Sequence, residues 1–210
     1  FLVPPTGTIT ARFEGSAGPL PSVDAVNLET ESGVAYSTVV RMGIHMAWLN
    51  AVRDGHLAPL REIAPDLLIF QFGGNEAASL GGFPEFTAET LRAQVREWLA
   101  KVKRLFPDTD VLVVGPPERL RMLQGALVPM EETMTVRSIQ REEAARAGMA
   151  FFDTYDLLGG PGQMLNMVTT GLAMDDYTHF TMRGGDTAAG GMYDSLMNAF
   201  RKTNGRPKLD

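Results

Sequence analysis

The chain contains no cysteine among its 210 residues, which excludes disulfides and metal sites built on thiolates. It also has no apolar run near the roughly 18 residues that a membrane-spanning helix needs. No cluster of Lys or Arg stands out, and the net charge is −6 with a sequence pI of about 5.1. This balance argues against a nucleic-acid or anionic-membrane partner held on a basic face.

The amino terminus has neither an initiator Met nor a basic segment leading into an apolar stretch. No signal peptide is therefore visible, and the missing Met leads us to expect sequence upstream. The remaining composition, with 44% hydrophobic and 21% charged residues, is ordinary for a globular protein that buries a substantial core. The sequence predicts neither a metal ion nor a cofactor.

The amino-acid composition and the apolar pattern change along the chain. Residues 1–32 are rich in Gly, Pro, Thr and Ser between short apolar stretches, which predicts the end of a β-rich module. Residues 33–204 alternate between strand and helix patterns and are predicted to form one α/β domain. Residues 205–210 are a polar tail.

The α/β part is predicted from its apolar spacing. Strands are expected at Val34–Val40, Leu67–Phe72, Val111–Val114 and Met149–Phe152, and helices at Thr87–Phe106, about 130–147 and Met182–Phe200. The continuous apolar run of Leu67–Phe72 is typical of a strand buried on both faces. Repeated strand–helix units indicate a parallel sheet with helices on both sides, and ligands of such sheets bind beyond the carboxyl ends of the strands.

The loop after Phe72 holds the first candidate site residues. Gly73 and Gly74 allow the backbone to turn sharply and to approach a ligand closely. Asn75 then offers a side-chain N–H where a donor to an oxyanion would be needed. The alternative is a turn with a capping Asn.

A second candidate group precedes the last helix. Asp176 and His179 are three residues apart, so one turn can bring the carboxylate to one imidazole nitrogen and leave the other as a general base. The alternative is a helix-capping Asp beside an incidental His. Asp153 also ends a predicted strand, but we interpret it as a helix cap.

Together these motifs resemble a known family. The segment Gly73–Glu76 is similar to the third sequence block of SGNH/GDSL hydrolases, G-x-N-[DE]. The segment Asp176–Thr181, followed by Gly184 or Gly185, is similar to the fifth block, D-x-x-H-[LF]-[TS]-x-x-G. The resemblance runs from about residue 33 to 200 and is greatest to bacterial carbohydrate O-acetylesterases with a β-rich insert.

This resemblance implies a flavodoxin-like, three-layer α/β/α fold and a serine esterase. Asn75 would donate to the oxyanion, His179 would be the general base and Asp176 would orient His179. The substrate would be an acylated carbohydrate or a small ester, and the family favours a periplasmic or extracellular location.

The second block of the family, G-x-N-G, corresponds here to Gly43, Ile44, His45 and Met46. The resemblance makes Gly43, Met46, Gly74 and His45 candidates for the oxyanion hole or for substrate contacts. A Met at the position of the second glycine keeps a backbone N–H but adds a Cβ. His45 is either a substrate contact or a core residue.

The first block, Gly-Asp-Ser, is missing from the chain, and Ser32 precedes the wrong strand to replace it. In the family this serine ends a central strand. Neighbours of an absent central strand would keep unpaired backbone groups, each costing about 1–3 kcal/mol when buried. We therefore expect an upstream segment or another chain to supply the strand. The alternatives are an O-acetyltransferase and a catalytically silent module that binds glycan or supports an assembly.

Overall fold

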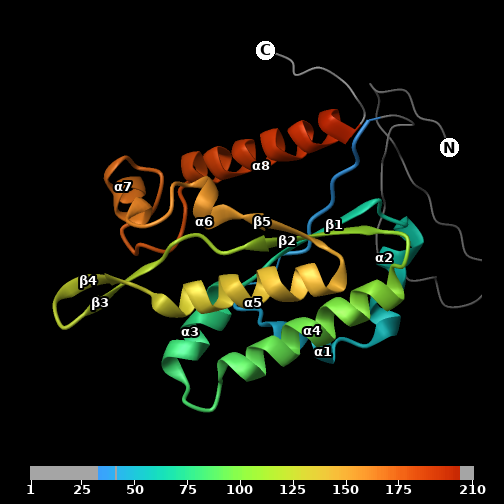
Figure 1. The fold of residues 1–210 in the computed structure, drawn as a ribbon, viewed down its shortest axis with the longest axis horizontal. Helices are drawn as coiled ribbons and strands as arrows, with labels where there is room; N and C mark the ends of the chain where they lie inside the picture. Colours follow the sequence, from blue (N-terminus) through green and yellow to red (C-terminus); the bar gives the residue numbers. More distant parts are fainter. Residues whose placement is uncertain (1–32, 41, 204–210) are drawn as a thin grey trace, which may run out of the picture. The chain divides into compact units, whose positions relative to one another are not determined.

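The computed structural model describes residues 33–40 and 42–203 (Figure 1). The chain divides into two compact units, residues 1–42 and 43–210. Every described helix and strand belongs to the second unit. The β-rich module predicted for residues 1–32 and the tail predicted for 205–210 lie outside the described residues.

The second unit alternates helices and strands along the chain. In order they are α1 (Met46–Ala51), a 3-10 helix (Asp54–Leu57), α2 (Ala58–Ile63), β1 (Leu67–Gln71), α3 (Gly74–Gly82), α4 (Ala88–Leu105), β2 (Asp110–Gly115), β3 (Leu120–Leu123), β4 (Ala126–Pro129), α5 (Glu131–Ala147), β5 (Ala150–Asp153), α6 (Thr154–Leu157), α7 (Gln163–Thr169) and α8 (Met182–Thr203).

The main sheet is parallel, with the strand order β1-β2-β5. Ile69 lies opposite Leu112, and Val114 lies opposite Phe152, so the three carboxyl ends share one edge. Figure 1 shows the sheet between α8 on one side and α4 and α5 on the other. This arrangement confirms the predicted α/β fold with helices on both faces of a parallel sheet.

The core lies between the sheet and the pair α4 and α5. The predicted apolar stripe of α4 is buried throughout: Leu91, Val95, Trp98, Leu99, Val102 and Leu105. Trp98 meets Phe70 of β1 edge to face, with ring centroids 5.4 Å apart. The Thr87 hydroxyl caps α4 by accepting the N–H of Thr90 at 3.2 Å, as its position before the stripe predicts.

The strand predicted at Val34–Val40 is wrong. These residues form no strand, and Val34 and Val39 are each 95% exposed. β-Branched residues favour a strand only where neighbouring strands and side chains complete it. Residues 34–40 pair with no strand among the described residues.

The expectation that β1 is buried on both faces is also wrong. Its side chains alternate, with Leu68 and Phe70 packed on the core and Leu67 and Ile69 exposed by 41% and 39%. By contrast, the apolar residues of β2 are buried on both faces. β1 differs because, among the described residues, it has a strand partner only on its β2 side.

Candidate active site

The turn after β1 is shaped by Gly73. Its φ of +132° belongs to a region that favours glycine, and a Cβ there would lie 2.9 Å from the side chain of Val136. The chain then enters α3 directly, so Asn75 sits in the first helical turn rather than in an open loop. The N–H groups of a first helical turn have no partner within their helix. The turn thus offers donors just beyond the carboxyl end of β1.

Asn75 and Glu76 hold the segment that precedes α1. The Asn75 side-chain amide donates to the carbonyl of Ile44 at 2.8 Å, and the buried Glu76 carboxylate accepts the N–H of Met46 at 2.8 Å. His45 Nδ1 lies 4.0 Å from the same carboxylate. The two segments that resemble the second and third family blocks therefore lie side by side.

These contacts show which of the predicted oxyanion donors already have a hydrogen-bond partner within the chain. Met46 has one backbone N–H, and Glu76 takes it, so the structure gives no support to Met46 as an oxyanion donor. Asn75 has two side-chain N–H groups and donates one to Ile44, which leaves the second. Gly43 has a φ of +69°, a conformation that favours glycine, and nothing lies within 4 Å of its Cβ position.

Asp176 and His179 form the pair that their spacing predicts. His179 Nδ1 lies 2.6 Å from Asp176 Oδ2, and Oδ1 accepts the N–H groups of Thr178 and His179, each at 3.0 Å. The hydrogen bond from the His179 side chain, together with these amides, holds the pKa of the Asp176 carboxyl below its usual value. A carboxylate on Nδ1 leaves Nε2 as the nitrogen able to accept a proton.

The turn that carries this pair is locked by the backbone. The N–H of Met174 donates to the carbonyl of His179 at 2.8 Å, and Tyr177 adopts a left-handed φ of +55°. The His179 side chain is 71% exposed. An exposed imidazole oriented by a carboxylate is arranged to exchange protons with a bound molecule.

Arg119 and Leu120, which the sequence did not single out, each contact one of the two motif segments. The Arg119 guanidinium donates to the carbonyl of Gly74, and the next N–H, that of Leu120, donates to Tyr177 at 3.2 Å. Burial lowers the pKa of Arg119, and the charge of Asp176 opposes that shift. The loop of Asn75 and the turn of His179 therefore meet at the segment that follows β2.

Asp153 has the structural role that we expected. Its carboxylate accepts the N–H of Asp156 at 3.4 Å and caps α6. It also forms a two-pronged ion pair with Arg137, at 2.7 and 2.6 Å. With both oxygens engaged, Asp153 stabilises the junction of β5, α5 and α6.

Two features are absent from residues 33–40 and 42–203. No group of three or more His, Asp or Glu side chains is placed to hold a metal ion. No helix in this part of the chain has the length and apolar character to cross a bilayer.

Comparison with known proteins gives a family match. The model of the GDSL-like lipase/acylhydrolase family matches residues 12–186. None of the curated protein sequences is similar enough to count as a match.

Solved structures share the fold at low sequence identity. A peptidoglycan O-acetylesterase is 24% identical with a TM-score of 0.68, and the match covers 76% of this chain and 45% of that one. An α/β hydrolase from the metagenome of Lake Arreo, Spain, is 14% identical with a TM-score of 0.55, covering 72% and 67%. A catalytic mutant of an acetylxylan esterase from Geobacillus stearothermophilus is 16% identical with a TM-score of 0.50, covering 72% and 67%. The chain thus spans less than half of the first of these proteins.

Proposed function

Because the chain belongs to the GDSL-like lipase/acylhydrolase family, we propose that it carries the histidine–aspartate part of a serine esterase that removes acetyl groups from a carbohydrate. The observation that carries this proposal is the 2.6 Å contact between His179 Nδ1 and Asp176 Oδ2 beside the Gly74 loop. The proposed substrate class draws on two neighbours in the fold, a peptidoglycan O-acetylesterase and an acetylxylan esterase.

In the proposed mechanism, a serine from outside this chain attacks the ester carbonyl, and His179 Nε2 accepts its proton. Asp176 stabilises the imidazolium that forms. His179 then returns the proton to the leaving sugar oxygen, and water releases acetate from the acyl-enzyme by the same route in reverse. The strand that bears the serine would come from an upstream segment or another chain.

Charge that develops on the ester oxygen needs donors at the carboxyl end of β1. The second side-chain N–H of Asn75 and the free N–H groups of the first turn of α3, which begins at Gly74, are the donors we propose. Gly43 and His45 would contact the substrate from the adjoining segment. An oxyanion-hole donor contributes about 2.7–4 kcal/mol to lowering the barrier.

The test is His179→Ala in the protein expressed from its complete gene, assayed by turnover of 4-methylumbelliferyl acetate. We expect kcat to fall by at least about 10³-fold with folding unchanged, because the general base is lost. His56→Ala is the matched control, since His56 is exposed on the 3-10 helix and belongs to neither motif. Turnover near the wild-type rate in His179→Ala would exclude His179 from the mechanism.

The same assay shows whether the acetyl group is transferred to water or to a sugar. If the wild-type protein transfers acetyl groups to an added sugar faster than to water, the chain belongs to an O-acetyltransferase. If it turns over no ester at all, the silent glycan-binding alternative holds.

A further inference from the structure

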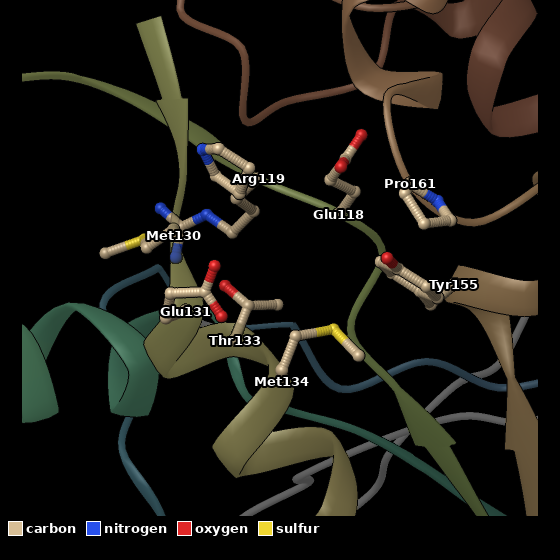
Figure 2. Close-up of a pocket in the computed structure, with 9 residues that line it drawn as sticks. Glu118, Arg119, Met130, Glu131, Thr133, Met134, Tyr155 and Pro161 are labelled. Atoms are coloured by element: carbon tan, nitrogen blue, oxygen red, sulfur yellow. The ribbon is translucent and has the colours of Figure 1, made fainter.

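The segment after β2 carries a buried carboxylate that the proposed mechanism does not use. This residue, Glu118, follows Pro116 and Pro117, whose rings fix the backbone φ, so it projects from a stiff stretch of chain. Only 7% of its surface is exposed. Figure 2 shows Glu118 and Arg119 at the wall of a small cavity, with their side chains leaving the segment in different directions. The two neighbours therefore hold different parts of the molecule.

Glu118 holds the start of α7. Its Oε1 accepts the N–H of Gly162, the N-cap residue of α7, and its Oε2 accepts the N–H of Met164 in the first turn, each at 2.8 Å. The N–H groups of a first helical turn have no partner within their helix. Hydrogen bonds to a carboxylate are roughly twice as strong as those between neutral groups. With both oxygens engaged, Glu118 fixes α7 relative to the end of β2.

The helix α7 in turn supports the turn that carries Asp176 and His179. The carbonyl of Met167, near the end of α7, accepts the N–H of Leu172 at 2.7 Å and that of Ala173 at 3.0 Å. Ala173 pairs with Phe180 in an antiparallel bridge, and the two residues close the base of the turn. A displacement of α7 would therefore carry the turn with it.

The segment after β2 also holds the same turn from its other side. The N–H of Leu120, two residues after Glu118, donates to the carbonyl of Tyr177 at 3.2 Å. Leu120 also packs with Met164 and Met167 of α7 in one buried cluster. The contacts form a closed circuit, from Glu118 to α7, from α7 to the turn, and from the turn back to Leu120. Glu118 is the link that a substitution removes, because the other hydrogen bonds of the circuit join backbone atoms.

We propose that Glu118 is a positioning residue for the Asp176–His179 pair: through α7, its carboxylate sets where this pair stands relative to the Gly74 loop. The carbonyl of Gly74 is held by Arg119, the next residue in the chain. Residues 118 and 119 thus tie the two halves of the candidate active site to one stiff segment. The inference rests on the proposed esterase function for its effect on catalysis, but the position of His179 is measured without turnover.

The test compares Glu118→Gln with the wild type, both expressed from the complete gene. A carboxamide keeps the size of the side chain but has one acceptor oxygen, so one of the two N–H groups at α7 loses its partner. Turnover of 4-methylumbelliferyl acetate should show kcat lowered by about tenfold to a hundredfold with KM unchanged, because the base is misplaced while the substrate contacts remain.

The second measurement is NMR of the protein labelled with ¹³C at the Cε1 atoms of histidine. The signal of His179 is identified by its absence from His179→Ala. In Glu118→Gln this signal should shift or broaden, because the imidazole changes its surroundings when α7 moves. The signal of His56, which belongs to neither motif, should stay in place as the internal reference.

Glu143→Gln is the matched control. Glu143 of α5 is also a buried carboxylate with two partners, Arg92 and Arg96, both at 3.0 Å, and it belongs to neither motif segment nor to α7. This variant should lose stability but keep the wild-type kcat and the wild-type His179 signal. If Glu118→Gln does not fold, Glu118→Asp takes its place, because it keeps the charge and withdraws it by one methylene.

The positioning role is overturned if the His179 signal in Glu118→Gln stays at its wild-type position, or if Glu143→Gln shifts it as far. It is also overturned if kcat of an active protein is unchanged in Glu118→Gln, whatever the change in KM. A wild type that turns over no ester overturns the esterase, and the NMR signal then still decides the position of His179. Turnover that is lost in His179→Ala but unchanged in Glu118→Gln overturns the positioning role and keeps the esterase.

Discussion

Arg119 is the residue through which the two motif segments meet. Its guanidinium holds the Gly74 carbonyl, and the backbone N–H of Leu120 holds Tyr177. The charge of Asp176 acts on the Arg119 guanidinium and opposes the lowering of its pKa by burial. This placement makes Arg119 a positioning residue for the Asn75 loop.

We expect Arg119→Ala to lower kcat on a small acetyl ester by about tenfold or more, because losing a charge-assisted hydrogen bond costs about 1.5–3 kcal/mol. Added guanidinium ion should restore part of the activity by filling the vacated space. Arg121→Ala is the control, since Arg121 pairs with Glu132 at 2.9 Å and touches neither motif. Equal losses in the two variants, or no response to guanidinium, would contradict the assignment.

Some residues of the candidate site can be proposed from the sequence, and others cannot, for a physical reason. Asn75, Asp176 and His179 could be proposed from the sequence because each stands in a local pattern, after a strand or at a spacing of three. Arg119 is missed because its role depends on a contact with Gly74, 45 residues away in the chain. Nothing in the residues around it distinguishes it from Arg121.

At the scale of elements, α4 and α5 are joined by ion pairs around one buried carboxylate. Glu143 accepts from Arg96 Nε and from Arg92, both at 3.0 Å, and its side chain is 1% exposed. Its neighbour Glu142 pairs with Arg92 at 2.6 Å but is 47% exposed. Removing the buried carboxylate should therefore cost more stability than removing the exposed one, because it leaves Arg96 without its partner.

We expect Glu143→Gln to lower the free energy of unfolding by about 1–3 kcal/mol at neutral pH. Glu142→Gln, the matched control, should cost about 0.5 kcal/mol or less. Urea denaturation of each variant, followed by circular dichroism, measures both values. Equal losses of unfolding free energy in the two variants would show that the burial of Glu143 adds nothing to its effect on stability.

The same pair predicts a pH dependence. The hydrogen bond from Arg96, and next that from Arg92, lowers the pKa of Glu143 in the folded chain, against the opposing effect of burial. A lowered folded pKa means that the stabilisation is present above the unfolded pKa of about 4.3 and is lost as the pH falls through the folded value. The difference in the free energy of unfolding between the wild type and Glu143→Gln should therefore become smaller at acid pH.

The two glycines at the start of α8 differ sharply. A Cβ on Gly184 would lie 1.8 Å from the backbone carbonyl oxygen of Leu172, whereas a Cβ on Gly185 meets nothing within 4 Å. Leu172 also accepts the N–H of Thr181 at 3.0 Å, in the segment that follows His179. Close backbone packing thus explains a glycine at position 184, the choice that the sequence alone left open.

Gly184→Ala should destabilise the protein by about 1–3 kcal/mol or more, because backbone must shift to admit the methyl group. Gly185→Ala should be neutral or stabilise by up to about 1 kcal/mol, since Ala favours a helix over Gly. Thermal unfolding of the two variants compares them directly. A melting temperature for Gly184→Ala at or above that of Gly185→Ala would contradict this reading.

Some elements are easier to predict than others. α4 and α5 have a long apolar period and clear ends, at Pro107 and Gly148, and their observed bounds lie within one or two residues of the prediction. The hairpin β3–β4 was missed because its two-residue turn is Gln124-Gly125, both with positive φ, where Asn-Gly is the familiar signal. The helix α3 was missed because its glycines read as a loop.

At the scale of the whole molecule, the described sheet is incomplete at β1. Its far edge carries no strand partner among residues 33–40 and 42–203, and Leu67 and Ile69 remain exposed. An exposed apolar edge strand invites pairing with another segment. This is the edge at which we expect the serine-bearing strand, next to the Asn75 loop.

That expectation leads to a labelling experiment. A fluorophosphonate reacts with an activated serine, so we expect it to modify the protein expressed from its complete gene at one serine that lies outside this 210-residue chain. His179→Ala should abolish the labelling, because the base that activates the serine is gone. Peptide mapping by mass spectrometry identifies the modified residue. If the label appears on a serine of this chain, such as Ser32 or Ser37, the nucleophile is not supplied by an added strand, and β1 must be completed in another way. Labelling at an outside serine that persists in His179→Ala would separate the nucleophile from the Asp176–His179 pair.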